Sequence, residues 1–495
     1  MLDTAFGLPL SRRELLRRSS IGFGQLALAS LLADTLPVQG SESSTVANPL
    51  APRLPHLAPR ARSVIFLFMQ GGPSHVDTFD YKPALERDHD KPIPFTQLAQ
   101  DEKNGVRTGN CLKPLWPFRK YGQSGIEVSD LFPHLGQCVD DMCFINSMKT
   151  VSGGHGPEVL RLHTGSERLI RPTLGSWVLY GLGSESQNLP GFISICPNFA
   201  FGNKQALNSA FLPAVYQTVP IGRSNAVGDA PSFREAKFNN TIAQLPRDWQ
   251  RRQLDFVLQA NRRQLEQGGP DTELEGRIAA FETAFRMQAE APSLLDFSDE
   301  TSETLQLYGV DEPGETDNYS RQCLLARRLV ERGVRFVEVY HAPKSYDGGW
   351  DQHNDIAKYH PMHAREVDKP MAALITDLKR RGLLDETLIV WGGEFGRSPG
   401  AQIVGGSGGR DHHPWGFTFW LAGGGVKGGL KYGKTDDYGY HAVENPVNFH
   451  DLHATILHLL GLDHQQLTFQ HGAEQVRLTN ALNGLDGNVL HDIVA

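Results

Sequence analysis

The chain has 495 residues, of which 40% are hydrophobic, so it can bury a large core and could hold two or three domains by length alone. Its net charge is −8, and no run rich in Lys or Arg lies outside the extreme N-terminus. This argues against a nucleic-acid binder, which needs a basic face to neutralise phosphates. The 51 Gly and 30 Pro residues are typical of a loop-rich α/β protein rather than of a helical bundle.

The N-terminus carries an export signal. Ser11-Arg12-Arg13 precedes a short apolar segment, Ile21 to Ala33, that is too short and weak for a transmembrane span. The arginine pair predicts a twin-arginine (Tat) signal peptide over residues 1–40, followed by an unstructured leader over 41–60. We therefore expect the Tat machinery as a partner, a periplasmic or extracellular location, and no stable membrane span after processing. An amphipathic surface helix is the alternative.

The number and spacing of the cysteines argue against two common roles of this residue. Their number is five, which leaves at least one unpaired, and no two of them form a CxxC pair. A disulfide scaffold and a cysteine zinc site are therefore both disfavoured.

Short apolar runs predict buried strands of a parallel sheet, and polar residues follow several of them. The runs are 63–69, 142–148, 334–340, 387–391 and 417–422. His75 and Asp77 come after the first, Asp351 and His353 after the third, and Glu394 after the fourth. In an open α/β sheet, ligands bind beyond the carboxyl ends of the strands, so these side chains are candidates for one metal site. Arg410-Asp411-His412-His413 leads into the last strand.

Ordinary structural roles compete with that interpretation. Glu394 and Arg397 could form a surface pair, and the loop histidines could be satisfied locally. His360 and His363 are expected on the solvated face or the cap of the helix that follows Asp355. Three further histidines alternate with core leucines on a helix capped by Asn448, and a structural role is expected for them: His450, His453 and His458.

A second stretch that could carry functional residues runs from Leu131 to Gly165. It predicts a helix over 131–140, a strand over 142–148, a glycine turn and a helix from about Pro157. His155 lies just before that helix N-terminus, where a phosphate- or sulfate-like anion could dock.

Residues 200–313 differ in composition from the rest of the chain. Helical periodicity over 233–290 predicts a mainly helical insertion, or cap, in which no catalytic pattern stands out. The glycine run 405–409 lacks the strand–loop–helix context of a dinucleotide loop, so no dinucleotide cofactor is predicted.

Taken together, these motifs resemble the alkaline phosphatase and sulfatase superfamily, and within it the Tat-exported, sulfatase-like family called domain of unknown function 1501. The resemblance covers nearly everything after the leader. The segments that carry it are Val64 to Asp80, Gly348 to Asp355, Gly392 to Pro399, Gly409 to Gly429 and His450 to Asp463. It implies an alkaline phosphatase-like α/β fold, with a mostly parallel central sheet, helices on both faces and a helical insertion within residues 61–495.

The resemblance also implies one or two divalent metal ions beyond the carboxyl edge of the sheet. Met69-Gln70-Gly71 replaces the aspartate that normally ends the first strand, so Asp77 or His75 would have to reach back. Glu394-Phe395 stands where the superfamily has Asp-His, and the late histidine is similar to His412, with His413 as the alternate. The candidate ligands are His75, Asp77, Asp351, His353, Glu394, Asp411 and His412. Such a mixed set suits zinc or manganese better than calcium or magnesium.

The nucleophile position departs from the superfamily pattern. Sulfatases show Cys-x-Pro-x-Arg there, whereas this chain has His155-Gly156-Pro157-Glu158-Val159, with no cysteine and no arginine. We therefore expect His155 to act as a base or a covalent nucleophile, and Arg397 or Arg410 to stabilise a transferring anion.

Two hypotheses of different classes follow. The first is an exported metal-dependent hydrolase of phosphate or sulfate esters, acting on a small-molecule or glycan substrate. The second is a catalytically degenerate relative that binds metal and anionic glycans without turnover.

Overall fold

The computed structural model describes residues 48–94, 108–198, 203–222, 233, 245–269, 271–312, 316–342, 348–402, 408–480 and 486–495. The predicted signal peptide and the first residues of the predicted leader lie outside these ranges, as does most of the glycine run 405–409. Among the described residues, no helix has the length and apolar character needed to cross a membrane.

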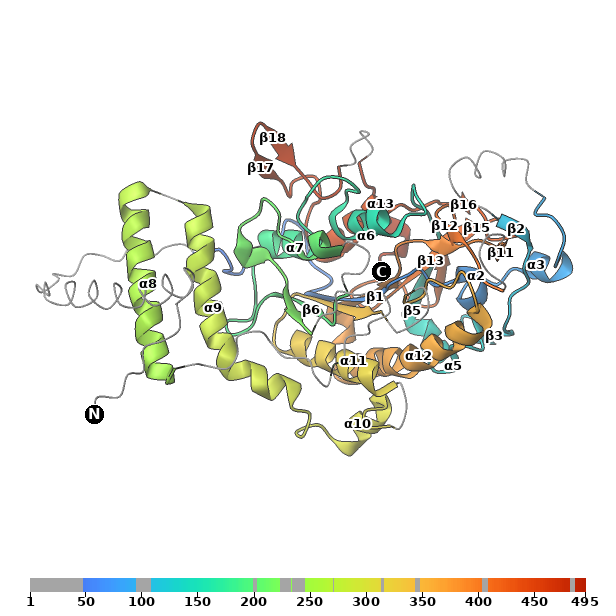
Figure 1. Ribbon diagram of the computed structural model, residues 1–495, viewed down its shortest axis with the longest axis horizontal. Coiled ribbons are helices and arrows are strands. Elements are labelled where there is room, and N and C mark those ends of the chain that lie inside the picture. The colour runs from blue at the N-terminus through green and yellow to red at the C-terminus, as the bar shows by residue number, and fades with distance from the viewer. Residues whose placement is uncertain are drawn as a thin grey trace, which may run out of the picture. The chain divides into compact units, whose positions relative to one another are not determined.

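An eight-stranded sheet with the order β14-β5-β13-β9-β1-β8-β6-β7 forms the centre of the fold (Figure 1). β1 is parallel to both of its neighbours, β8 and β9, whereas β13 is antiparallel to β5 and β9. The expected α/β class with a mostly parallel central sheet is confirmed. The strands are β1 (Ser63–Met69), β5 (Met142–Met148), β6 (Phe192–Ile195), β7 (Val219–Ile221), β8 (Phe336–His341), β9 (Thr387–Gly392), β13 (Phe417–Ala422) and β14 (Leu430–Tyr432).

Alternation along β1 explains why helices cover both faces of the sheet. Its side chains are all buried, because successive residues point to opposite faces and both faces are packed. Ile65, Leu67 and Met69 belong to one hydrophobic core, and Val64, Phe66 and Phe68 belong to the other.

The two helical layers fill these cores (Figure 1). α5 (Pro133–Gly136), α11 (Thr316–Glu331) and α12 (Ile356–Arg380) pack on the face of Ile65. α6 (His155–Thr164), α7 (Leu174–Leu182) and α13 (Phe449–Leu459) pack on the face of Phe66. As predicted, Asn448 caps α13, and it forms a capping box with Asp451.

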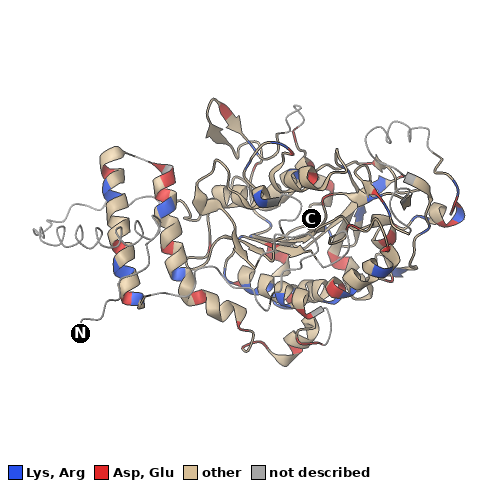
Figure 2. Cartoon of the chain, viewed as in Figure 1, with Lys and Arg blue, Asp and Glu red and all other residues tan. Residues whose placement is uncertain are grey.

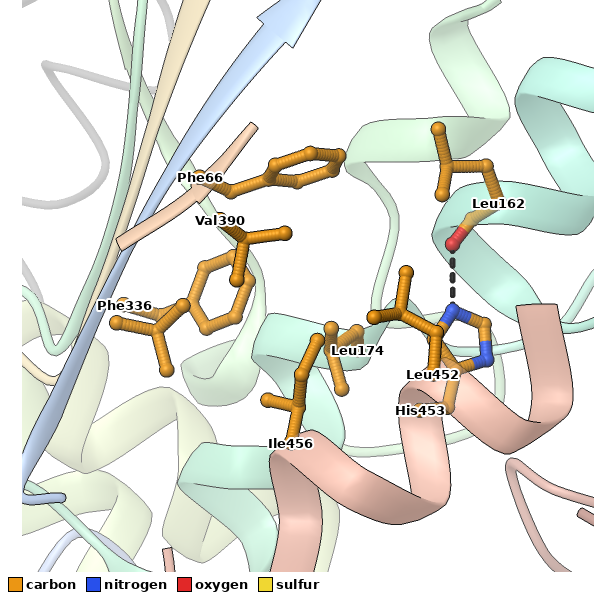
Figure 3. A pocket seen from close by; sticks show the side chains of 9 residues that line it. Phe66, Leu162, Leu174, Phe336, Val390, Leu452, His453 and Ile456 are labelled. Atoms are coloured by element: carbon orange, nitrogen blue, oxygen red, sulfur yellow. Dashed lines mark hydrogen bonds between the residues drawn. The ribbon is translucent and has the colours of Figure 1, made fainter. Parts of the chain in front are cut away.

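The structural role expected for the α13 histidines is seen in a small apolar cavity between the sheet and α6, α7 and α13 (Figure 3). His453 lines this cavity and donates from Nε2 to the Leu162 carbonyl of α6 (2.6 Å). His450 donates in the same way to the Gly165 carbonyl (2.9 Å). Both imidazoles therefore fasten α13 to the end of α6.

Some elements differ from the sequence-based expectations. The helix predicted over 131–140 is divided into α5 and a 3-10 turn at Val139–Asp141, because Gly136 and the following residues do not continue the α-helix. α6 begins at His155 itself rather than at Pro157. His360 and His363 are both buried in α12, so their expected place on a solvated face was wrong.

Residues 48–60, the described part of the predicted leader, run along the main fold. Their backbone amides donate to carbonyls at the ends of α7 and α13, for example from Arg53 to Leu182 and from Arg60 to Leu459. The segment is therefore fixed by main-chain hydrogen bonds despite its Pro-rich composition.

The predicted helical insertion contains two long helices, α8 (Arg247–Gly268) and α9 (Thr272–Leu295), and the shorter α10 (Ser302–Tyr308). It also supplies β7, which pairs in parallel with β6 at the edge of the central sheet. The compact unit that covers Ala47–Ala495 includes this segment.

Candidate metal centre

The carboxyl edge of the sheet gathers polar loops from four strands. Gly71 follows β1, Asp351 follows β8 and Glu394 follows β9, and these three strands are adjacent and parallel. The loop after β5 leads into α6 and brings His155 to the same edge. Because β13 runs antiparallel, its beginning lies at this edge as well, and the preceding His412 joins the group. The topology thus collects residues that are far apart in sequence.

Three donor atoms form a tight triangle at the centre of the cluster. His353 Nε2 lies 2.9 Å from His412 Nε2 and 3.0 Å from Asp351 Oδ1, and His412 Nε2 lies 2.9 Å from the same oxygen. Adjacent donors around an ion with bonds of about 2.0–2.1 Å are separated by about 3 Å. Two imidazoles and one carboxylate with these separations fit the first ligands of a divalent transition metal.

The protonation state of His412 is the one that a metal ligand needs. His412 Nδ1 donates to the Gly153 carbonyl (2.5 Å), and burial, together with the charge of Arg397, lowers the pKa of His412 to about 3. The ring is therefore neutral near pH 7 and has one N–H, which donates a hydrogen bond to the Gly153 carbonyl. Its Nε2 lone pair then faces an ionised carboxylate oxygen of Asp351. The same Oδ1 accepts from Arg397 Nη2, and a bound cation would be a further positive partner for both His412 Nε2 and Asp351 Oδ1.

Two overlapping groups of ligand atoms surround this point. His155, Asp351 and His412 form one, and His353, Asp411 and His412 form the other, with ligand atoms within 4.8 Å of one another in each group. These five residues offer three imidazoles and two carboxylates, a donor set suited to zinc or manganese.

His155 lies between two carboxylates. Its Nδ1 contacts Glu394 Oε1 (2.6 Å), and its Nε2 contacts Asp351 Oδ2 (3.0 Å). Burial would lower the pKa of His155, but the two carboxylates outweigh burial and raise it to about 9. Glu394 is itself fixed, because the Gly71 amide donates to both of its oxygens (3.0 and 3.1 Å). A carboxylate on the distal nitrogen is the usual partner of a metal-bound histidine.

Arg397 compensates the negative charge of Asp351. Its Nη2 donates to Asp351 Oδ1 (2.6 Å), and its remaining contacts are with the carbonyls of Gly71, Gly72 and Arg410. Burial alone would raise the pKa of Asp351, but Arg397 and the three imidazoles hold it far below its ordinary value. The Arg397 guanidinium is fully buried and turned toward protein acceptors.

The structure places the other predicted site residues apart from this cluster. Asp77 binds Arg410 Nε (2.6 Å) and Ser74 Oγ (2.6 Å), and it accepts from the Leu115 amide (3.1 Å). Arg410 directs its other donors to the carbonyls of Ser398, Pro399, Leu112 and Lys113. His75 donates from Nε2 to the Gly439 carbonyl (2.8 Å). Neither His75 nor Asp77 belongs to a metal-ligand group among the described residues.

Sequence reasoning missed a series of hydrogen bonds that supports the loop of Asp351. Trp350 Nε1 donates to His341 Nδ1 (2.9 Å), so the neutral His341 ring carries its proton on Nε2 and donates it to Glu366 (2.7 Å). The His341 pKa is lowered to about 3 by burial. These hydrogen bonds hold the loop that carries Asp351 against the end of β8. The only sequence signal for them is that His341 directly extends a strand.

With the site defined, comparison with known proteins identifies the family. The family described as "Protein of unknown function (DUF1501)" matches residues 61–494. The chain belongs to this DUF1501 family, as its motifs predicted. No curated protein matches the chain.

The solved structures to which the chain is similar include the three that follow. The sulfatase PsFucS1 from Pseudoalteromonas sp. is 12% identical, with 81% of this chain and 68% of that chain covered and a TM-score of 0.33. The phosphonate monoester hydrolase SpPMH from Silicibacter pomeroyi is 13% identical (87% and 76% covered, TM-score 0.32). A protein in the alkaline phosphatase superfamily from Vibrio parahaemolyticus is 10% identical (90% and 81% covered, TM-score 0.33). Architecture does not fix chemistry, so the activity of this DUF1501 protein is argued from its site.

Proposed function

We propose that this DUF1501 protein is a metal-dependent hydrolase of phosphate or sulfate esters. The observation that carries the proposal is the His353–His412–Asp351 triangle, in which a neutral imidazole presents its lone pair to an ionised carboxylate. Asp351, His353, His412 and Asp411, together with His155, would hold the metal. A divalent ion at such a site supplies Lewis-acid polarisation of an ester oxygen.

The surrounding residues prepare the site for that chemistry. Glu394 orients the His155 ring through Nδ1, which leaves Nε2 directed into the cluster. Arg397 Nη2 contacts the same Asp351 oxygen, Oδ1, as His353 and His412, and its charge keeps the carboxylate ionised. Positions that are fixed before substrate binds lower the reorganisation needed during reaction.

The first test measures metal and turnover together. We expect the purified protein to contain zinc or manganese in near-stoichiometric amount, and to hydrolyse aryl phosphates or aryl sulfates. Asp351→Asn and His412→Ala should lose most of both. His75→Gln, which changes a buried histidine outside the cluster, is the matched control and should retain both. A metal-free wild type, or metal retained in both cluster variants, would refute the proposal.

A second test separates the two roles of His155. If His155 is a ligand, His155→Ala lowers metal content and Glu394→Gln weakens metal binding by roughly 10- to 100-fold. If His155 is instead the base or covalent nucleophile, the alanine variant keeps its metal but loses roughly two to four orders of magnitude in turnover. The Nδ1 contact with Glu394 is the arrangement of a metal-bound histidine, and with a pKa of about 9 His155 would release its Nε2 proton when metal binds.

The second candidate function is binding of metal and anionic glycans without turnover. Its support is that the two arginines expected to stabilise a transferring anion are engaged elsewhere: Arg397 and Arg410 are fully buried and bonded to protein acceptors. Anion binding would then rest on the metal. In that case the protein would contain metal and bind a sulfated polysaccharide in a metal-dependent manner, while aryl esters would remain unhydrolysed.

We also propose export by the Tat pathway to the periplasm or beyond, on the basis of Arg12 and Arg13. Replacing both arginines by lysine keeps the charge but removes the motif. The double variant should accumulate in the cytoplasm, as shown by fractionation, and normal delivery would exclude the Tat route.

A further inference from the structure

α8 is a long helix that its own chain hardly buries. Of its 22 residues, only Leu258 and Leu265 are buried, and both lie on the side that packs against α9. Trp249 is 58% exposed and Val257 is 41% exposed. Most helical stability in proteins comes from burying one face. Burial of only two residues is therefore unusual for a helix of this length.

Several apolar residues of α8 and α9 line a groove between the two helices. Leu254 and Val257 line it from α8, and Phe281, Ala284 and Phe285 line it from α9. Phe281 is 48% exposed. The groove lies between two long helices, a setting that suits a partner helix.

The charges of the two helices are opposite (Figure 2). α8 carries five arginines and three carboxylates, a net charge of +2, whereas α9 carries four glutamates and two arginines, a net charge of −2. One intramolecular pair, Arg251 Nη2 to Glu282 Oε1 (2.9 Å), already joins the helices. Arg262 and Arg263 lie near the α8 end of the hairpin turn, at the level of Glu273 and Glu275 on α9.

We propose that the α8–α9 hairpin is the interface of a homodimer, with α8 of each copy packed on α9 of the other. A two-fold axis parallel to the helices produces this arrangement, and the four helices then alternate in direction as in an antiparallel bundle. Rotation about such an axis leaves every residue at the same level along the bundle. The basic end of α8 in one copy therefore meets the acidic end of α9 in the other, and Val257 and Phe281 both lie in the contact surface.

The size of the surface suits a stable dimer. A 22-residue helix is about 33 Å long, and two helices side by side are about 20 Å wide. The hairpin face thus offers about 660 Å² per copy, or about 1,300 Å² in total, which falls within the range of specific interfaces. An anionic lipid surface fits less well, because the acidic α9 runs beside the basic α8.

The test measures mass by sedimentation velocity or light scattering. The wild type should sediment as two chains, and Val257→Glu and Phe281→Glu should be monomeric with a dissociation constant raised roughly a hundredfold or more. Val443→Glu, at a position 60% exposed in β16 (Ala442–Glu444), is the matched control and should remain dimeric. Unchanged thermal unfolding of the monomeric variants would show that the hairpin itself stays folded.

A charge exchange distinguishes a second copy from any other occupant of the groove. Arg262→Glu with Arg263→Glu, and separately Glu273→Arg with Glu275→Arg, should each weaken self-association roughly tenfold or more. Mixing the two variants should restore dimers, since each then offers what the other lacks. A monomeric wild type, variants that do not recover on mixing, or a monomer that instead binds anionic vesicles through Val257 would overturn the proposal.

Discussion

At the scale of single residues, burial sets the protonation states that give the site its character. Burial keeps His412 neutral while Arg397 keeps Asp351 ionised, although His412 Nε2 and Asp351 Oδ1 lie 2.9 Å apart. An ionised carboxylate ordinarily protonates a neighbouring imidazole through their mutual attraction, so the neutral state of His412 is the unusual one. A neutral His412 has one unprotonated ring nitrogen, which is the form that a metal ligand requires.

Glu158 on α6 is a second buried group with a displaced protonation equilibrium. It accepts from Thr150 Oγ1, and Arg161 Nε lies 3.3 Å from it. Burial outweighs these contacts and raises the Glu158 pKa from 4.5 to about 7. The folded state thus binds the proton more tightly than the unfolded chain does. The contribution of Glu158 to the free energy of unfolding is fully present below about pH 4.5 and is lost as the pH rises through 7.

Glu158→Gln should therefore change stability in a pH-dependent way. Near pH 4.5 both proteins carry a neutral side chain, so their free energies of unfolding should agree closely. At pH 8 the variant should be more stable by roughly 2–3 kcal/mol, because it avoids ionising a buried carboxyl. Urea denaturation at both pH values measures the difference. Glu444→Gln, on an exposed strand, serves as the control, and an equal difference at both pH values would contradict the assignment.

At the scale of elements, close backbone approach fixes the loop that carries the candidate ligands. Gly71 has a φ of +108°, and a Cβ there would lie 2.5 Å from the Asp351 amide nitrogen. A Cβ on Gly409 would lie 2.0 Å from the His353 carbonyl oxygen. The loops after β1 and β8 and the segment before β13 thus pack main chain against main chain, which leaves no space for a side chain.

Gly409→Ala should consequently disturb both stability and metal binding. The methyl group must displace the backbone of His353, which we expect to cost roughly 1–3 kcal/mol and to separate His353 from His412. The thermal midpoint and the metal content should both fall. Gly268→Ala, at the end of α8 with no atom within 4 Å of the added Cβ, should leave both unchanged or slightly raise the midpoint. Normal metal content in Gly409→Ala would show that this packing does not position His353.

At the scale of the whole molecule, the candidate centre joins segments from across the chain. His155 belongs to α6, Asp351 follows β8, Glu394 follows β9 and His412 precedes β13. A metal held among them cross-links both halves of the sheet edge, so binding should contribute to global stability. A ligand at one hundred times its dissociation constant stabilises a protein by about 2.7 kcal/mol.

Chelation should lower the thermal midpoint of the wild type, and added zinc or manganese should restore it. Asp351→Asn should unfold at one temperature with or without chelator, because it has no metal to lose. Calorimetry of the two proteins measures both effects. If chelator lowers the midpoint of the wild type and the variant equally, the stabilising ion is bound elsewhere.

The sequence alone determined the strands that build the site and the edge at which its loops meet. The apolar runs of β1, β5, β9 and β13 and the capped helix α13 appear at the predicted residues, because each rests on local hydrophobic pattern and turn chemistry. The motifs around Asp351, Glu394 and His412 also identified the family correctly.

Only the tertiary structure decided which residues meet. His353 and His412 are 59 positions apart, and their 2.9 Å contact depends on β13 running antiparallel between β5 and β9. The saturation of Arg397 and Arg410 by carbonyl and carboxylate oxygens depends on loops that no local pattern orients. Local propensity fixes where an element begins and ends, whereas the partner of a buried charge is fixed by packing between elements. For that reason the sequence could nominate Asp77 and Asp351 equally, whereas the fold paired Asp77 with Arg410 and placed Arg397 together with three imidazoles around Asp351.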